Sequence, residues 1–598
     1  MNAVKRRRVS WALAISLLAL VSGAWAQNAE DGQADESAVE DIFFGEIINV
    51  RVVNVDVWVT DKKGNRILGL TKDDFEMFEN KTQVKITNFY EYAEGKEVIV
   101  EEDVPEPEPE PVKPRRREDL FTSHPGFRSS DVPEDQRLSL MVYVDQLNIT
   151  PFDRNRVFRY LRQFLRTKLD RDDRVMLVTY NRSLKVVRPF TSDPGMIADA
   201  TYELEKHTGG RTLQRSERHD ILRDINRDQV NYYQALGRVR MHAQNVENDL
   251  QFTLDGIREA VKQLAGIPGR KALLYISNGL PMRAGEDLFW AIDERFANDE
   301  NVSDISSSAI MEVFQFDMSR RFDELASLAN ANRVTFYTLD AAGLRVGGMR
   351  SAEYQATNFS VNIDSLYNHN LQDSIIYLAD RTGGQAIVNT NNFAGGFDKF
   401  AGDFENRYSL GFSPSHGGTG RRFKLRVELK KSVHKAYGKK LRVRYRDSYR
   451  DKPVVQEMGD ATLAALTFGY QSNPLGVTFT LDEGPDAQIA RDDGNYLVTF
   501  LIRIPIANVV LIPVGDHHEA RVRVFVQAID DKNKVSVVQE KPVELVIKTD
   551  DLETAKDEYW VYELKLLMEK GDQRVAVGVR DDLTARSSFL SRVVSVGS

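Results

Sequence analysis

The pattern of apolar and polar residues divides the chain into three regions. In the first, valines alternate with other residues over 53–59, which is the period of a half-buried β-strand. In the second, short apolar strands such as 138–144 alternate with helical stretches such as 155–169. This alternation predicts a parallel sheet covered by helices on both faces. In the third, period-2 runs separated by polar turns predict an antiparallel β-sandwich.

Further elements of the second region follow the same alternation. Strands are predicted at 174–180, 184–188, 271–277 and 333–339, and helices at 252–264, at 322–331 and from Leu371 to Gly383. Three insertions depart from a minimal α/β unit: Thr212–Asp249 is charged and helical, Met282–Met318 is acidic and polar, and Ala342–Asn370 is polar and loop-like. We expect all three to crowd one rim of the sheet.

These regions predict an α/β protein with several domains. The order of its parts is a signal peptide (1–26), an acidic leader (27–45), an N-terminal β-domain (46–98), a Pro/Glu-rich linker (99–136), a central α/β domain with three insertions (137–405), a β-strand extension that packs with the N-terminal module (406–450) and a C-terminal β-sandwich (460–598).

The N-terminus has the three parts of a secretory signal. Basic residues 5–8 precede an apolar run over 9–21, and Ala24-Trp25-Ala26 forms a small-residue cleavage site before Gln27. The apolar run is shorter than the roughly 20 residues that span a bilayer, which argues against an uncleaved anchor. We therefore expect export to the periplasm or the cell exterior, with no transmembrane helix in the mature chain.

Composition and charge exclude several classes of function. With 42% hydrophobic and 28% charged residues, the chain has the composition of an ordinary globular protein. A net charge of −9, with the 80 basic residues spread along the chain, gives no reason to expect a nucleic-acid partner. The absence of cysteine excludes disulfides, thiolate metal sites and a cysteine nucleophile.

Several segments resemble a known family. In chain order they are VWVTDKKGNRILGLTKDDFEMFEN, LSLMVYVDQLNIT, IPGRKALLYISNGLP, LADRTGGQA and YSLGFSP. They are similar to the secreted von Willebrand factor type A (VWA)-related proteins of the acidobacterial type, over roughly Asp41 to Arg446. The resemblance implies a Rossmann-like central VWA domain whose upper rim can carry a metal-ion-dependent adhesion site.

In this family the rim normally provides Asp-x-Ser-x-Ser, a middle-loop Thr and a later Asp within Ser-Asp-Gly. Here Asp145 matches the first Asp, while Leu147 and Ile149 stand at the serine positions and offer no oxygen. Thr212, or alternatively Thr208, matches the middle-loop Thr, and Asn278 replaces the later Asp. The resemblance therefore leaves Asp145, Thr212 and Asn278 as metal ligands, a poor set for Mg²⁺.

We interpret the metal site as degenerate and expect no cofactor, with Mg²⁺ as the alternative. A local bulge that turned Asn148 and Thr150 inward would restore oxygen ligands. The alternative role for Asp145 is structural: its carboxylate caps the following helix or accepts backbone N–H groups at the strand end.

Catalytic motifs are missing from the sequence. There is no phosphate-binding Gly-rich loop, no His-Glu-x-x-His and no nucleophile elbow. His517 and His518 stand beside Asp516 and Glu519, where a polar turn between strands explains them better than a metal site.

The sequence favours an exported, non-enzymatic protein–protein interaction protein of the adhesion or scaffold type, whose protein partner it does not name. The predicted partner-binding rim consists of Asp145, Gln146, Asn148, Thr150, Arg211, Thr212, Asn278 and Gly279. Two alternatives remain open. One is an envelope-polymer hydrolase with its site in an insertion, and the other is carbohydrate binding by the C-terminal sandwich through Tyr559, Trp560 and Tyr562.

Overall fold

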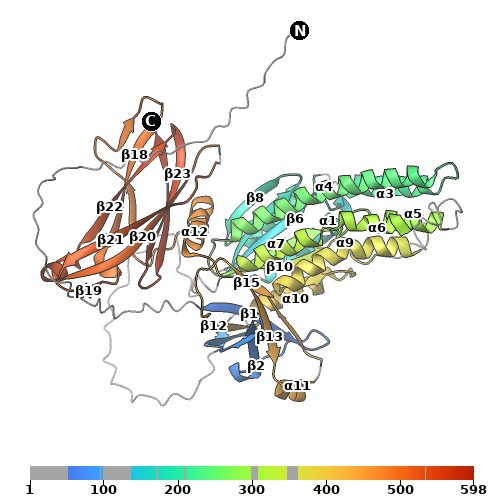
Figure 1. Ribbon diagram of the computed structural model, residues 1–598, viewed down its shortest axis with the longest axis horizontal. Helices are drawn as coiled ribbons and strands as arrows, with labels where there is room; N and C mark the ends of the chain where they lie inside the picture. Colours follow the sequence, from blue (N-terminus) through green and yellow to red (C-terminus); the bar gives the residue numbers. More distant parts are fainter. Residues whose placement is uncertain are drawn as a thin grey trace, which may run out of the picture. The chain divides into compact units, whose positions relative to one another are not determined.

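The computed structural model describes residues 52–93, 96–98, 137–169, 173–207, 211–297, 307–345, 361–438, 440–532 and 534–597. The predicted signal peptide, acidic leader and linker lie outside these residues. The expectation of a mixed α/β protein is confirmed, and the chain divides into two compact units, one formed by Val50–Tyr470 and the other containing Gln471–Ser598. Figure 1 shows the elements of both units along the sequence.

A six-stranded sheet forms the centre of the first unit, with strand order β11-β10-β9-β6-β7-β8. Its strands are β6 (Leu138–Asp145), β7 (Arg174–Tyr180), β8 (Leu184–Thr191), β9 (Arg270–Ser277), β10 (Val334–Asp340) and β11 (Ala386–Ile387). All neighbouring pairs are parallel except β7 and β8. The strand order reverses between β6 and β9, and in such sheets ligands bind beside the carboxyl ends of the two strands at the reversal.

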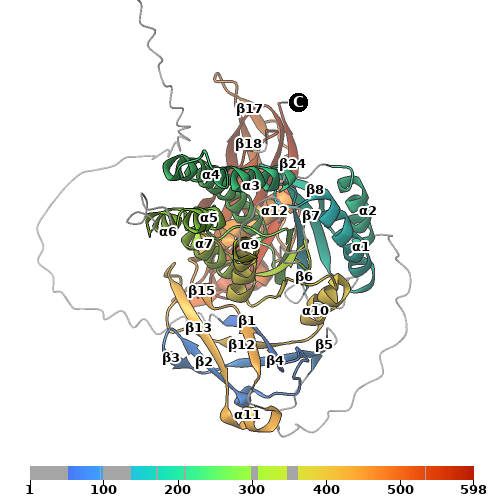
Figure 2. The same ribbon diagram turned by 90° about the vertical axis from the view of Figure 1, so that its right-hand side faces the viewer.

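Helices cover both faces of this sheet (Figure 2). One face packs against α1 (Pro151–Thr167), α2 (Pro194–Leu204) and α10 (Phe393–Glu405), and the other against α4 (Tyr232–Leu264), α7 (Ser319–Ala331) and α9 (Val361–Thr382). Alternate residues of each strand serve the two faces, so Leu140 and Val142 lie in one apolar core while Met141 and Tyr143 lie in the other. Burial on both faces explains why the strands read as continuous apolar runs.

The insertions form a helical projection with a core of its own. It consists of α3 (Arg211–Ile225), the first half of α4, α5 (Glu286–Phe296) and α6 (Ser307–Val313), which Figure 1 shows. The 3₁₀ turn η2 (Phe314–Phe316) and Ile363 of α9 also contribute to its core. The sequence interpretation treated a helical insertion, Thr212–Asp249, and a helix at 252–264 as separate elements, whereas the single helix α4 of 33 residues joins them. It also took Met282–Met318 as a polar segment. Apolar side chains at helical spacing, among them Leu288 and Ile292, fill the core between charged residues, and the charge concealed this pattern.

A small β-domain combines strands from distant parts of the chain. Its first sheet has the order β14-β1-β12-β4-β5, and its second the order β15-β13-β2-β3. The strands are β1 (Val53–Thr60), β2 (Phe75–Glu79), β3 (Thr82–Val84), β4 (Asn88–Ala93), β5 (Lys96–Val98), β12 (Arg407–Phe412), β13 (Arg422–Leu429), β14 (Arg442–Tyr445) and β15 (Ser448–Arg450). The 3₁₀ turn η1 (Lys72–Asp74) and α11 (Lys431–Tyr437) connect them. Strand β1 pairs with β12 and β14, so residues on both sides of the central domain build one apolar core.

Asp403 of α10 ties the small β-domain to the central domain. Its fully buried carboxylate accepts hydrogen bonds from Arg444 at 2.8 and 2.9 Å, from Arg66 at 2.8 Å and from Gln385 at 2.5 Å. Its backbone carbonyl accepts a hydrogen bond from the Trp58 indole at 3.0 Å. Two guanidinium groups of the small β-domain therefore share one carboxylate of the central domain.

The C-terminal unit contains two antiparallel sheets that share one apolar core. One sheet contains β16 (Thr478–Leu481), β17 (Gln488–Ala490), β18 (Tyr496–Pro505) and β22 (Tyr559–Met568), and the other contains β19 (Ile512–Val514), β20 (His517–Ile529), β21 (Gln539–Lys548), β23 (Gly571–Asp581) and β24 (Ser587–Val596). The shorter elements are η4 (Ile506–Asn508), η5 (Thr549–Asp551) and α13 (Leu552–Ala555).

Helix α12 (Val454–Phe468) belongs to the first unit, where it packs on α4. The C-terminal unit therefore begins at Gln471 and not at residue 460. Among the helices of the described residues, none combines the length and the apolar character needed to cross a membrane.

Candidate functional site

The carboxyl ends of β6 and β9 place Asp145, Ser277 and Asn278 beside one another at the rim of the central sheet. Asp145 is fully buried. One of its carboxylate oxygens accepts the backbone N–H of Asn148 at 3.0 Å, and the other accepts the Asn148 side-chain amide at 2.9 Å and the Tyr275 hydroxyl at 2.5 Å. Both oxygens are thus engaged in holding the loop that follows β6, which is the structural role considered for this residue.

Three buried tyrosines surround the Asp145 carboxylate from the sheet below. Tyr143 lies between Tyr180 and Tyr275, with ring centroids 6.4 and 5.5 Å away. Burial, followed by the negative charge of Asp145, raises the pKa of Tyr275 well above its usual value and that of Tyr180 to about 12. These hydroxyls therefore stay protonated, and that of Tyr275 donates to the carboxylate.

The two serine positions of the adhesion motif have become part of the cores. Ile149 is fully buried in the apolar cluster on one face of the sheet, and Leu147 is buried in the cluster on the other face. The Asn148 side-chain amide N–H groups donate to Asp145 and to Thr253.

Asn278 and Thr150 belong to a hydrogen-bond network centred on Asp153. The Thr150 side chain caps α1 by accepting the backbone N–H of Asp153 at 3.2 Å, and Pro151 follows at the first helical position. The Asp153 carboxylate in turn accepts the Thr150 hydroxyl at 2.7 Å and the Asn278 amide at 2.8 Å. Arg156 donates to the same carboxylate at 3.2 Å, so a cation already neutralises it.

Asp340 and Arg345 are rim residues that the sequence interpretation missed. Asp340, at the carboxyl end of β10, is fully buried and receives the Arg345 guanidinium at 2.8–3.0 Å and the Gln372 amide at 2.8 Å. Arg345 also donates to the Asn278 carbonyl at 2.8 Å. The apolar run 334–339 ending in Asp340 repeats the pattern of 138–145 and signals the carboxylate, but no pattern signals its arginine.

The remaining predicted rim residues differ in their placement. Gln146 is buried and accepts a hydrogen bond from Arg154 at 2.7 Å. Gly279 has φ +87°, and a Cβ there would lie 2.3 Å from the Leu371 carbonyl oxygen, so the turn requires glycine. Arg211 and Thr212 begin α3, and their side chains, like Thr208, lie outside what the structure describes.

The residues present do not fit a divalent cation. The carboxylates of Asp145, Asp153 and Asp340 are already bonded to hydroxyl, amide or guanidinium donors. Mg²⁺ needs near-octahedral oxygen ligands and one or two free carboxylates. Within the described ranges, no three His, Asp or Glu side chains converge in a group that could hold a metal ion.

We expect neither Mg²⁺ nor Mn²⁺ to raise the melting temperature of the protein beyond the effect of NaCl at equal ionic strength. A ligand that binds only the native state must stabilise it, so differential scanning fluorimetry on the wild type and Asp145→Ala measures this directly. A rise in the wild type that Asp145→Ala abolishes would show that the cation binds at the rim after all.

The candidate residues of the C-terminal unit have structural contacts. His517 lies 3.0 Å from Asp516 and 2.9 Å from Glu519, and these two acids raise its pKa. Trp560 and Tyr562 pack in part against the apolar core, while Tyr559 is exposed.

Comparisons with known proteins give no close relative. No protein-family model matches the sequence, and no curated protein matches it. The chain is similar to an aerotolerance-related membrane protein from Bacteroides fragilis (13% identity, 45% of this chain and 98% of that one, TM-score 0.20). It is also similar to a variant of the PilB minor pilin from Streptococcus sanguinis (10% identity, 47% and 63%, TM-score 0.25).

A third similar structure is a von Willebrand factor type A protein from Catenulispora acidiphila (8% identity, 77% of this chain and 66% of that one, TM-score 0.21). Scores this low carry no weight for function. The strand order of the central sheet and the helices on its two faces are those expected from the sequence resemblance. The central domain therefore has the helix-covered, mostly parallel sheet that the resemblance to VWA-related proteins implies.

Proposed function

We propose that this protein is exported and acts without catalysis, by binding another protein at the helical projection above the rim of its VWA-related domain. The rim residues predicted to contact the partner are largely buried: Asp145, Gln146, Asn148, Asn278 and Gly279 are all inaccessible. A partner approaching this end of the domain would instead meet the projecting helices.

The observation that carries the proposal is a group of large apolar side chains exposed on the projection. Met241 of α4 is 65% exposed, Met311 of α6 is 63% exposed and Phe314 of η2 is 63% exposed. The neighbouring residues Arg240 and Glu312 form an ion pair that joins α4 to α6. Single exposed apolar residues are ordinary, but exposed Met and Phe side chains on adjoining elements are typical of protein-binding surfaces.

The double variant Met311→Glu/Phe314→Glu is expected to reduce capture of envelope proteins by the purified mature chain at least about tenfold, a loss of about 1.4 kcal/mol in binding. Charges at these positions would have to be desolvated when the surface is covered. Quantitative mass spectrometry of captured proteins, with and without chelator, measures the effect. Adding a chelator should leave the amount of captured protein unchanged.

A matched control carries the same charge change elsewhere. Val561 and Val593 of the C-terminal unit are 47% and 59% exposed, and Val561→Glu/Val593→Glu should leave capture unchanged. Equal capture by both double variants and the wild type would refute a binding surface on the projection.

A further inference from the structure

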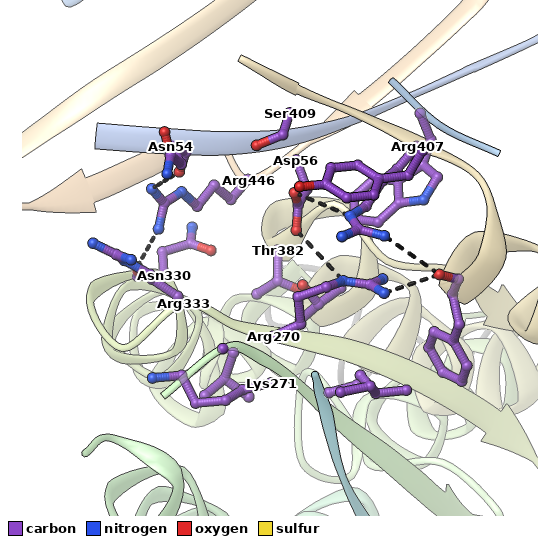
Figure 3. Close-up of a pocket in the computed structure, with 18 of the residues that line it drawn as sticks. Asn54, Asp56, Arg270, Lys271, Asn330, Arg333, Thr382, Arg407, Ser409 and Arg446 are labelled. Atoms are coloured by element: carbon purple, nitrogen blue, oxygen red, sulfur yellow. Dashed lines mark hydrogen bonds and ion pairs between the residues drawn. The ribbon is translucent and has the colours of Figure 1, made fainter. Parts of the chain in front are cut away.

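A pocket of about 430 Å³ lies at the opposite end of the central sheet from the rim, where the strands begin. One wall consists of β1, β4 and β12 of the small β-domain, and the other of the first residues of β9 and β10 (Figure 3). Among the described residues, its lining contains none of the rim residues and none of the residues of the helical projection.

Basic side chains dominate its lining. They are Arg270, Lys271, Arg333, Arg407 and Arg446, and the acidic residue among the described lining residues is Asp56. Asp56 lies 3.5 Å from Arg407 and 3.9 Å from Arg270, distances of weak ion pairs. Asp56 therefore faces two arginines, Arg270 and Arg407, and Figure 3 shows Arg446 on the same side of the pocket.

Arg446 is one of the buried cations of this group. It donates only to backbone carbonyls, at 2.7 Å to Asn54 and at 3.4 Å to Asn330, and its Nε is buried without an acceptor among the described residues. Burial, and then the charge of Arg333, lowers the pKa of Arg446 to about 9. A buried guanidinium that faces carbonyls rather than a carboxylate is costly, and an anion beside it would offset that cost.

Arg407 and Lys271 have similar surroundings. Arg407 stacks on the Tyr92 ring at 3.8 Å, and burial followed by the charge of Arg270 lowers its pKa to about 10. Lys271 is 7% exposed, and its ammonium donates to the Ala265 carbonyl at 2.9 Å. Burial, and then the charge of Arg333, lowers the Lys271 pKa well below its usual value. Arg407 is thus repelled by Arg270, and Lys271 by Arg333.

The backbone of Arg333, one of the pocket residues, has an unfavourable conformation. Arg333 has φ +56°, which is unfavourable for a residue with a Cβ, and directly precedes β10. Strain of this kind persists where the surrounding structure enforces it and is frequent at binding sites.

We propose that this pocket binds a small multivalent oxyanion, a molecule with two or more phosphate or carboxylate groups, held by Arg270, Arg407 and Arg446. Guanidinium groups suit this role because their planar donors match the oxygens of phosphate and carboxylate. The aromatic residues Tyr90, Tyr337 and Trp58 also line the pocket. Binding there would join the two domains that form the walls, and it does not depend on the proposed partner.

Isothermal titration of the full mature chain with pyrophosphate tests the proposal, with citrate as competitor. Saturable binding that weakens with salt is expected. Arg407→Gln and Arg446→Gln should each weaken it at least about tenfold. Asp56→Asn should act in the opposite direction and tighten binding, because it removes the competing carboxylate. Competition by citrate would extend the ligand class to carboxylates, and its failure would restrict the class to phosphates.

Arg320→Gln is the matched control, since this arginine of α7 is 90% exposed and lies outside the pocket lining. Absence of binding to wild-type protein would overturn the proposal. So would binding that Arg407→Gln and Asp56→Asn alter no more than Arg320→Gln does. Asp56→Asn is expected to tighten pyrophosphate binding, whereas the arginine variants weaken it. Loss of folding cannot produce tighter binding, so this variant tests the proposal even if an arginine variant fails to fold.

Discussion

Replacing Asp403 by alanine is expected to lower the free energy of unfolding of the Val50–Tyr470 unit by about 3–5 kcal/mol, as measured by urea denaturation. The carboxylate is fully buried, while its partners Arg66 and Arg444 are 25% and 20% exposed. Its removal leaves Arg66 and Gln385 with the Lys399 carbonyl, and Arg444 with the carbonyls of Gly383 and Gly384, as acceptors among their described contacts, so two partly buried guanidinium groups lose their counter-charge. Removing one partner of such a buried cluster lowers the free energy of unfolding by more than the intact cluster adds to it, because the remaining charges stay buried without a counter-charge.

The matched control is Asp398→Ala on the same helix. Asp398 is 59% exposed and pairs with an exposed lysine, Lys168, so solvent replaces the contact, and the urea midpoint should remain that of the wild type. Trp58 gives an additional readout, because its indole donates to the Asp403 carbonyl and its fluorescence should change when the small β-domain separates from the central domain. Equal midpoints for the two variants would contradict a stabilising role for Asp403.

Asp340→Ala is the second substitution for which a large effect is expected, again about 3–5 kcal/mol of unfolding free energy. Asp340 is fully buried and Arg345 is 14% exposed, and the pair is bidentate. Without the carboxylate, the guanidinium retains only the Asn278 carbonyl and the Asn368 side chain as acceptors among its described contacts.

The double variant Asp340→Ala/Arg345→Met separates loss of the pair from exposure of a lone charge. Replacement of both members of a buried ion pair is often nearly neutral, because no uncompensated charge remains. We therefore expect the double variant to recover most of the stability that Asp340→Ala loses. If the double variant were as unstable as Asp340→Ala, the unpaired charge of Arg345 would not be the reason for the lost unfolding free energy.

The central sheet could be predicted from the sequence because its signal is local. Each strand, such as 138–144, is a short apolar run buried on both faces, and each covering helix carries an apolar stripe. The helical projection was harder to predict, because charged residues of α3 and α5 lie on the same short elements as the side chains of its core. Helices α10 and α12 were also missed, since glycines interrupt the pattern of both.

The candidate site could be predicted only in part, because the residues that contact its carboxylates are distant in the sequence. A strand that ends in a carboxylate identifies Asp145, and the same pattern would have found Asp340. Their partners come from elsewhere in the chain: Tyr275 is 130 residues from Asp145, and Gln372 is 32 residues from Asp340. The cationic pocket draws on residues from Asp56 to Arg446, and no local pattern signals such a set.

The pairing of β1 with β12 has a consequence for how the protein is made. Trp58 and the Asp403 carbonyl that it contacts are 345 residues apart. Strand β1, the first strand of the described residues, therefore meets its pairing strands β12 and β14 only after most of the chain has been synthesised. Pairing across such a separation is slow, and an unpaired strand edge invites aggregation meanwhile. The small β-domain should therefore be the last part of its unit to mature, and a nascent chain stalled before β12 should need a chaperone to stay in solution.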